Sequence, residues 1–340
     1  MNKPLVSIVV VTLNRREELT EAVESLRWQT YSNTEIIVVD NGSSDGTQQM
    51  VKESFPDVRL VELDRNTGAY HGRNVGVDAS RGKLVFFLDD DATLEKEAIA
   101  EIVGRFSRED RLGVIVCKLV SAGSHVLDMG PHFSAESAEN EFYLGDMALE
   151  GATAIRRDVF ESVGGWPAHY FRQYVGKDLS YRIIDAGYHI LYFPRATAFH
   201  KESALGNMSR SQIEKQKMFY KIRNQLWISW KYLPPARAAL ESVVKITYHF
   251  GEALKMRAVG PYLKGLGAAA ISMPRIILKE RRPVSSSTVA QIDYMAYGGV
   301  ITQAEMLASL RPIPFRTLLW RKLVTLLSRE RNRSLSEKPR

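Results

Sequence analysis

The chain has 340 residues, of which 45% are hydrophobic and 25% charged, so it has the composition of a globular protein with one large core or two modest ones. Its single cysteine, Cys117, excludes a disulfide framework and a cysteine-based zinc site. The net charge of +7 is uneven, because residues 1–200 hold 21 Lys and Arg against 30 Asp and Glu, whereas residues 201–340 hold 25 against 9. This asymmetry suggests that the C-terminal part meets an anionic partner, such as nucleic acid or an anionic membrane.

The first 90 residues alternate between short β-branched runs and segments with a helical spacing of apolar residues. Strands are predicted over residues 5–12, 35–39, 58–63 and 83–88, and helices over residues 16–28, 47–54 and 69–79. Strands that alternate with helices indicate an α/β fold with a mostly parallel, doubly wound sheet. The first strand-to-helix junction, Thr12-Leu13-Asn14-Arg15, contains no glycine, which argues against a dinucleotide-binding turn and an NAD enzyme.

The rest of the chain divides at a change of pattern. Residues 1–205 are predicted to form the α/β domain, residues 206–325 a basic, amphipathic and mainly helical extension, and residues 326–340 a disordered tail. The N-terminus lacks an apolar signal region, and no apolar stretch is long enough to span a bilayer. A cytoplasmic location is therefore the default expectation.

Three consecutive acids, Asp89, Asp90 and Asp91, directly follow the buried run over residues 83–88. In open α/β sheets, ligands bind at the carboxyl ends of the strands, so these acids are expected at a crevice. Adjacent carboxylates repel one another unless a positive charge lies among them, and a divalent cation that carries a diphosphate is a natural occupant. The alternative is a solvated acidic turn that caps the following helix.

Further candidate residues follow the other strands. Asp40 ends the second predicted strand as Asp89 ends the fourth, so the two acids face one crevice if these strands are close together. Asp40 could then accept the N3–H of a uracil or thymine ring, or it could serve only the turn that follows. Arg73 lies in a glycine-containing segment that permits close backbone approach, and it could pair with phosphate or remain solvated. His200 is either a metal ligand or a satisfied structural histidine.

In this order and spacing, the motifs resemble the family-2 glycosyltransferases with the GT-A fold. The resemblance covers roughly residues 5–230, through the segments 9–15, 38–47, 66–74, 88–91, 151–152, 156–157, 164–166, 178–182 and 199–200. It implies that residues 1–205 form a GT-A nucleotide-diphospho-sugar transferase domain. Residues 223–234 look like a branch that contains many rhamnosyltransferase-like and cell-surface polysaccharide enzymes.

The resemblance also implies a donor site for a UDP- or dTDP-sugar and a requirement for Mn²⁺ or Mg²⁺. The implied roles are the pyrimidine for Asp40, the nucleotide pocket for Thr12 and Asn14, the base or diphosphate for Arg73, the ribose for Asp89 and Asp90, and the metal for Asp91 and His200. Such enzymes invert the anomeric centre in one displacement, so a carboxylate must deprotonate the acceptor hydroxyl, here of a cell-surface glycan or a lipid-linked acceptor.

The chain departs from this family where the base is expected. Relatives usually carry a pair of acids shortly before the Asp-Leu-x-x-Arg element, but this chain has Val175 and Gly176 there. Asp178, at the start of a predicted helix, is the nearest carboxylate and is predicted to be the base, although a structural pair with Arg182 is the alternative. The second hypothesis for the chain is a non-catalytic nucleotide-sugar or glycan binding protein.

The basic extension is predicted to bind an anionic membrane surface and to place the crevice beside its acceptor at the inner membrane face. The alternative is a helical packing domain whose lysines are only solvated. Nucleic acid is not expected as a partner, because the basic region lacks a recognisable reading motif.

Overall fold

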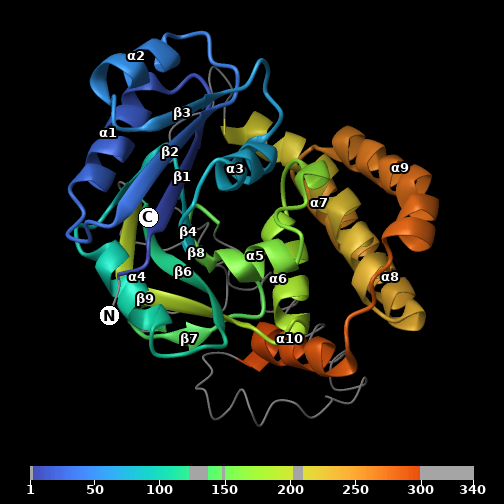
Figure 1. Ribbon diagram of the computed structural model, residues 1–340. Coiled ribbons are helices and arrows are strands. Elements are labelled where there is room, and N and C mark those ends of the chain that lie inside the picture. Colours follow the sequence, from blue (N-terminus) through green and yellow to red (C-terminus); the bar gives the residue numbers. More distant parts are fainter. Residues whose placement is uncertain (1–2, 122–136, 148–149, 202–209, 299–340) are drawn as a thin grey trace, which may run out of the picture.

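The computed structural model describes residues 3–121, 137–147, 150–201 and 210–298 (Figure 1). The predicted boundary near residue 205 and the predicted tail over residues 326–340 lie outside the described residues.

The described strands form one mixed sheet in the order β3-β2-β1-β4-β8-β6-β9-β5, and β7 pairs with β9. The strands are β1 (Val6–Thr12), β2 (Thr34–Asp40), β3 (Arg59–Glu62), β4 (Leu84–Asp89), β5 (Ala92–Leu94), β6 (Leu112–Ser121), β7 (Phe142–Tyr143), β8 (Ala152–Arg156) and β9 (His189–His200). Strands β3, β2, β1 and β4 are parallel, whereas β8 runs antiparallel between β4 and β6. The predicted doubly wound α/β architecture is confirmed, and the antiparallel β8 makes the sheet mixed.

Helices cover both faces of this sheet (Figure 1). One face packs against α1 (Arg16–Arg27), α2 (Thr47–Ser54) and α4 (Ala98–Phe106), and the other against α3 (Ala69–Asp78), α5 (Arg157–Ser162) and α6 (Val175–Asp185). In the central strand β1, Ile8 and Val10 enter the first core and Val9 enters the second. This explains why the strand is apolar along its length, because a parallel strand covered on both faces has no solvent side.

The C-terminal part is helical, as predicted, over the residues that are described. It consists of α7 (Arg210–Tyr232), α8 (Pro235–Lys255), α9 (Val259–Arg275), the π-helical turn η3 (Ile276–Glu280) and α10 (Ser286–Gly298), and two 3-10 turns, η1 (Ser137–Glu139) and η2 (Ala168–Tyr170), precede it. Trp227, Ile228 and Tyr232 of α7 belong to the same buried cluster as α6, so this helix completes the second core. Among the described helices, none is both long enough and apolar enough to cross a membrane.

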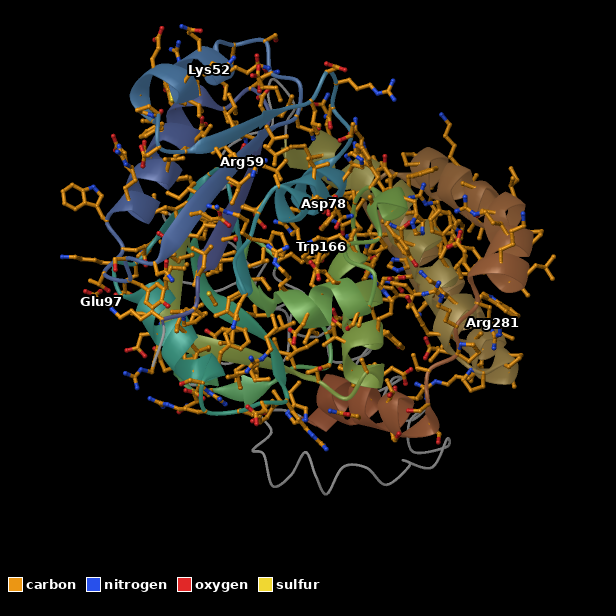
Figure 2. All side chains as sticks on the ribbon, viewed as in Figure 1. Lys52, Arg59, Asp78, Glu97, Trp166 and Arg281 are labelled. Carbon is orange, nitrogen blue, oxygen red and sulfur yellow. The ribbon has the colours of Figure 1, made fainter. Side chains whose placement is uncertain are left out.

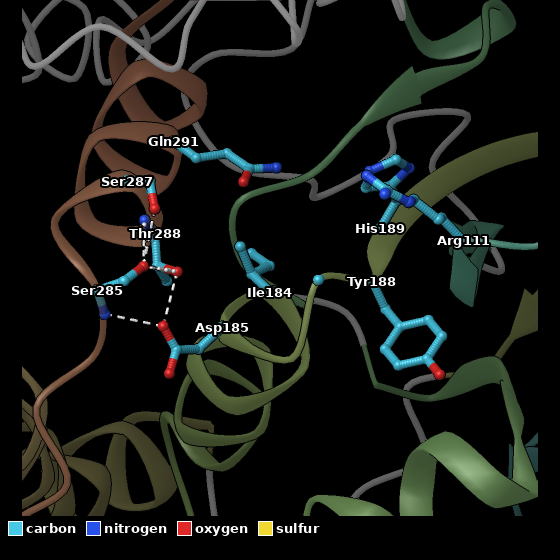
Figure 3. Close-up of a pocket in the computed structure, with 10 residues that line it drawn as sticks. Arg111, Ile184, Asp185, Tyr188, His189, Ser285, Ser287, Thr288 and Gln291 are labelled. Atoms are coloured by element: carbon cyan, nitrogen blue, oxygen red, sulfur yellow. Dashed lines mark hydrogen bonds between the residues drawn. The ribbon is translucent and has the colours of Figure 1, made fainter.

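A cavity of about 200 Å³ lies where the end of α6 meets the start of α10 (Figure 3). Asp185 of α6 accepts hydrogen bonds there from the Ser285 backbone N–H and the Thr288 hydroxyl, both at 2.8 Å. None of the predicted site residues lines this cavity, so we do not assign it to the site described below.

Candidate active site

The ends of three parallel strands bring the predicted residues together. In the register of the sheet, Thr12 of β1 lies opposite Asp40 of β2, and Val11 lies opposite Asp89 of β4. Because β1 separates β2 from β4, the two acids flank the end of β1 on its two sides. The predicted acids therefore meet at the carboxyl ends of the strands, where ligands bind in open α/β sheets.

Asp40 is fully buried and has one oxygen to spare. Its Oδ2 accepts hydrogen bonds from the Ser43 backbone N–H at 3.0 Å and from Gln48 Nε2 at 2.7 Å, whereas Oδ1 has no partner among the described residues. A buried carboxylate oxygen without a donor is costly, so Oδ1 is suited to receive a donor from a ligand. Asn14, at a φ of 53°, accepts the Ser44 backbone N–H at 2.7 Å and so holds the following loop beside β1.

The acidic run contains an arginine that was not among the predicted site residues. Arg15 Nη1 lies 3.0 Å from Asp90 Oδ1 and 2.7 Å from Asp91 Oδ2. Burial raises the pKa of Asp90 to about 6 in spite of Arg15, while His200 and Arg15 outweigh burial and hold the pKa of Asp91 below its usual value. The three adjacent acids were the one sequence signal that pointed to Arg15, because they require a positive charge among them.

Asp89, Asp91 and His200 could hold a metal ion, because one ligand atom from each lies within 4.8 Å of the others. Strand pairing creates this group, since Ala92 of β5 lies opposite His200 of β9. His200 Nε2 is 3.1 Å from Asp91 Oδ1 and 3.7 Å from Asp89 Oδ2. Carboxylate oxygens with one imidazole suit Mn²⁺ and Mg²⁺. The structure thus brings the two predicted metal ligands, Asp91 and His200, together and adds Asp89 to the group. Asp90 instead pairs with Arg15.

Arg73 is buried below the crevice and fixes Asp89. Its Nη2 donates a hydrogen bond to Asp89 Oδ1 at 2.7 Å, and its guanidinium lies 5.4–5.6 Å from the ring centroids of Tyr70, Phe87 and Trp166. Figure 2 shows Trp166 in the interior of the molecule, on the α3 side of the sheet. Burial lowers the pKa of Arg73 but Asp89 and its neighbours raise it further, so the side chain remains charged. The Nη1 group has no partner among the described residues and is a donor that a diphosphate could use.

Asp178, the predicted base, is fully buried in an ion-pair network. Its Oδ1 accepts a hydrogen bond from Arg182 Nε at 3.0 Å, and its Oδ2 accepts one from Lys231 Nζ of α7 at 2.8 Å. Burial alone would raise the pKa of Asp178, but Arg182 and Lys231 hold it below its usual value. This geometry corresponds to the structural pair with Arg182 that the sequence offered as the alternative, and it engages both carboxylate oxygens with cations.

The loop before α6 is strained and is held from α7. Phe171, Gln173 and Tyr174 adopt φ values of 59–64°, a region that non-glycine residues seldom occupy. Asn224 Nδ2 donates hydrogen bonds to the backbone carbonyls of this loop, at 2.6 Å to Arg172 and 2.9 Å to Gln173. The fully buried Asn224 therefore ties the loop before α6 to α7.

Comparison with known proteins gives this geometry a context. Residues 7–164 match the family model described as glycosyl transferase family 2. Over 218 residues the chain is 26% identical to the glycosyltransferase AglE of Haloferax volcanii, a match that covers 62% of this chain and 71% of AglE.

Two solved structures share the fold. The mannosyltransferase PcManGT from Pyrobaculum calidifontis, in complex with GDP-Man and Mn²⁺, is similar with a TM-score of 0.54 and 18% identity over 96% of this chain and 88% of that one. GalNAc-T7 with UDP, GalNAc and Mn²⁺ is similar with a TM-score of 0.52 and 18% identity over 66% of this chain and 52% of that one. The predicted GT-A fold is confirmed.

Proposed function

We propose that this chain, which carries a family 2 glycosyltransferase domain over residues 7–164, transfers a sugar from a nucleotide-diphosphate donor to a hydroxyl group. The observation that carries the proposal is the group of Asp89, Asp91 and His200 at the strand ends, on the edge where Asp40 keeps an unpartnered oxygen. The possible cation site suits the diphosphate, and the buried oxygen of Asp40 suits a hydrogen-bond donor on the base, so the two fit opposite ends of a nucleoside diphosphate.

In this proposal Asp89, Asp91 and His200 hold Mn²⁺ or Mg²⁺, and the cation neutralises charge on the departing diphosphate. Asp40 Oδ1 accepts the N3–H of a uracil or thymine ring, which favours a UDP- or dTDP-sugar, and Thr12 and Asn14 border the same pocket. By the resemblance, the transfer inverts the anomeric centre, and the acceptor belongs to a cell-surface glycan or is lipid-linked, as in the rhamnosyltransferase-like branch.

The helical region is proposed to bind an anionic membrane surface. Val243, Phe250 and Leu254 of α8 are 63%, 42% and 55% exposed and share one helical face, and Ile271 of α9 is 84% exposed. Residues 201–340 hold 25 Lys and Arg against 9 Asp and Glu, which complements an anionic surface. Residues 1–205 would then transfer the sugar while residues 206–325 hold the crevice at the membrane.

Vesicle flotation tests this part of the proposal, with phosphatidylserine-containing vesicles at low salt. Replacing Leu254 and Ile271 together by serine should lower the vesicle-binding constant by about a hundredfold or more, because burial of each apolar side chain contributes roughly 1.5–3 kcal/mol. Trp28→Ser is the matched control, since Trp28 is 73% exposed but lies at the end of α1. Equal binding of the double variant and the wild type would exclude this face as the membrane contact.

The donor site is tested by a melting-temperature panel with UDP, dTDP, GDP, CDP and ADP, each with and without Mn²⁺. A ligand at about a hundred times its Kd stabilises by roughly 2.7 kcal/mol, which raises the Tm of a protein of this size by several degrees. We expect a shift with one pyrimidine diphosphate that requires Mn²⁺. No shift with any nucleotide would contradict the proposal. Binding without turnover of any nucleotide sugar would instead support the non-catalytic alternative, which the buried Asp178 favours.

A further inference from the structure

Transfer of a sugar to a hydroxyl group requires a group that takes the hydroxyl proton, and this inference rests on the proposed function. The carboxylates of the acidic run already face cations, because Arg73 contacts Asp89, and Arg15 contacts both Asp90 and Asp91. Asp178 is sealed between Arg182 and Lys231. A different carboxylate is therefore needed at the crevice.

Glu150 lies close to the acidic run because the next residue, Gly151, contacts Asp89. The Asp89 backbone N–H donates a hydrogen bond to the Gly151 carbonyl at 2.8 Å, and Gly151 immediately precedes β8. A Cβ atom at residue 151 would collide with Asp89 Oδ2, so only glycine lets this segment pass so close to the acid. The backbone thus brings Glu150 to the same strand end as Asp89.

The Glu150 carboxylate is held in place by two donors from different elements. The Gly176 backbone N–H, in the first turn of α6, donates to Oε1, and the Tyr70 hydroxyl of α3 donates to Oε2. Tyr70 also lies beneath the guanidinium of Arg73, which pairs with Asp89. These contacts orient the carboxylate relative to the proposed metal site and leave it without a direct ion pair in the described structure.

Gly176 supplies the space for this carboxylate. A Cβ atom at residue 176 would collide with Glu150 Oε1 and with the Met147 carbonyl oxygen, so the glutamate occupies the place that a side chain at 176 would take. The sequence lacks an acid at 175–176, and the structure fills that position from a loop that is 26 residues earlier in the chain.

We propose that Glu150 is the catalytic base that takes the proton of the acceptor hydroxyl. As the acceptor oxygen bonds to the anomeric carbon, the bond from that carbon to the diphosphate oxygen breaks, and its electron pair leaves with the nucleoside diphosphate. The acceptor proton passes to a carboxylate oxygen of Glu150 and from there to solvent. Burial raises the pKa of Glu150 to about 7, which suits a group that accepts a proton near neutral pH.

The test compares Glu150→Gln with the wild type in the release of nucleoside diphosphate from UDP-glucose, UDP-galactose, dTDP-rhamnose and GDP-mannose, with water as the acceptor. The amide keeps an oxygen acceptor but cannot take the proton, so kcat should fall about 10²–10⁴-fold. The Kd for the nucleoside diphosphate with Mn²⁺ should not change, and the Tm should not fall. Asp146→Asn is the matched control, because Asp146 lies in the same loop but pairs with Lys177 at 3.2 Å, and it should keep wild-type turnover.

The outcomes separate this inference from the proposed function. A wild type that turns over none of the donors would overturn the proposed function and the base with it. If the wild type is active and Glu150→Gln keeps kcat within about threefold, Glu150 is not the base. A parallel loss of Tm and of nucleotide affinity in Glu150→Gln would show a structural role and overturn the assignment. Glu150→Asp, which keeps a carboxylate, should retain more turnover than Glu150→Gln; the reverse order would also contradict it.

Discussion

Two carboxylates, Glu150 and Asp178, lie at the first turn of α6, and their pKa values shift in opposite directions. Glu150 accepts the Gly176 N–H, while Asp178 lies two residues further along, about 200° around the helix, and faces Lys231 of α7. Burial raises the pKa of Glu150 to about 7, whereas Arg182 and Lys231 hold the pKa of Asp178 below its usual value despite its burial. Buried acids of similar chemistry thus diverge according to whether a cation contacts them directly.

The difference separates a group that can exchange a proton from one that holds helices together. Asp178 joins α6 to α7 through buried charge pairs, and a carboxylate whose pKa is lowered by two contacting cations is a weak base. Burial raises the pKa of Glu150 to about 7, and the two neutral donors that hold the carboxylate do not cancel that rise.

The largest effect on stability is expected from Lys231→Met, which removes one partner of the buried pair with Asp178. Removing one partner of a buried ion pair leaves an uncompensated charge and typically costs about 3–5 kcal/mol of the free energy of unfolding. Urea denaturation measures this loss. Lys52→Met is the control, because Lys52 and Glu62 form a pair whose side chains are 54% and 41% exposed, and its loss should cost no more than about 1 kcal/mol. Equal losses in both variants would show that the Asp178 network does not stabilise the protein.

On the crevice side, Asp91→Asn should abolish stabilisation by a nucleoside diphosphate with Mn²⁺, which is roughly 2.7 kcal/mol at a hundred times the Kd. Without ligand, this variant should melt below the wild type, because it removes the buried partner of Arg15 and His200, so the readout is the loss of the Mn²⁺-dependent shift. Differential scanning fluorimetry with and without ligand measures both values. Asp57→Asn, at an exposed pair with Arg27, is the control. An Asp91→Asn variant that keeps the Mn²⁺-dependent shift would remove Asp91 from the metal site.

An intermediate effect is expected from Asn224→Ala, which acts on the loop that leads into α6. The substitution removes the donor to the carbonyls of Arg172 and Gln173 and should destabilise the protein by about 1–3 kcal/mol, because those carbonyls lose their partner. Donor affinity should remain, since Asn224 lies outside the crevice. Urea midpoints and nucleotide titration provide the two measurements. A fall in donor affinity without a loss of stability would place the loop in the donor site.

The sequence predicted the parts of the site that local pattern determines. Asp40 and Asp89 are found at strand ends because apolar runs that stop in acids mark those ends, and parallel pairing then brings the two together. His200 was linked to the acids only by the resemblance, since nothing local shows that β9 pairs with β5. The pairing of Lys231 with Asp178 depends on how α7 packs, which the local sequence does not encode.

Arg15 and Glu150 were missed for the same physical reason. Each lies next to a recognisable motif, but its role depends on a contact with a distant segment. Arg15, in the loop after β1, contacts the acidic run, and Glu150, in the loop before β8, contacts α6. The absence of an acid at Gly176 was visible in the sequence. The side chain that fills the space became visible only when the two segments were placed together in three dimensions.

The most direct contrast between the two acids is their pH dependence. A carboxyl group whose pKa is raised on folding stabilises fully below its unfolded pKa of about 4.3, and that stability is lost as the pH rises through its folded pKa, about 7 for Glu150. For Asp178 the pKa is lowered, so its stabilisation is present above about pH 4 and is lost only in more acidic solution. Between pH 5 and 8, the wild type should therefore lose stability relative to Glu150→Gln, whereas the difference between the wild type and Asp178→Asn should stay constant. Urea midpoints at pH 5, 6, 7 and 8 measure both differences. Parallel curves for the wild type and Glu150→Gln would mean that Glu150 titrates as an ordinary exposed acid, and the contrast across α6 would be lost.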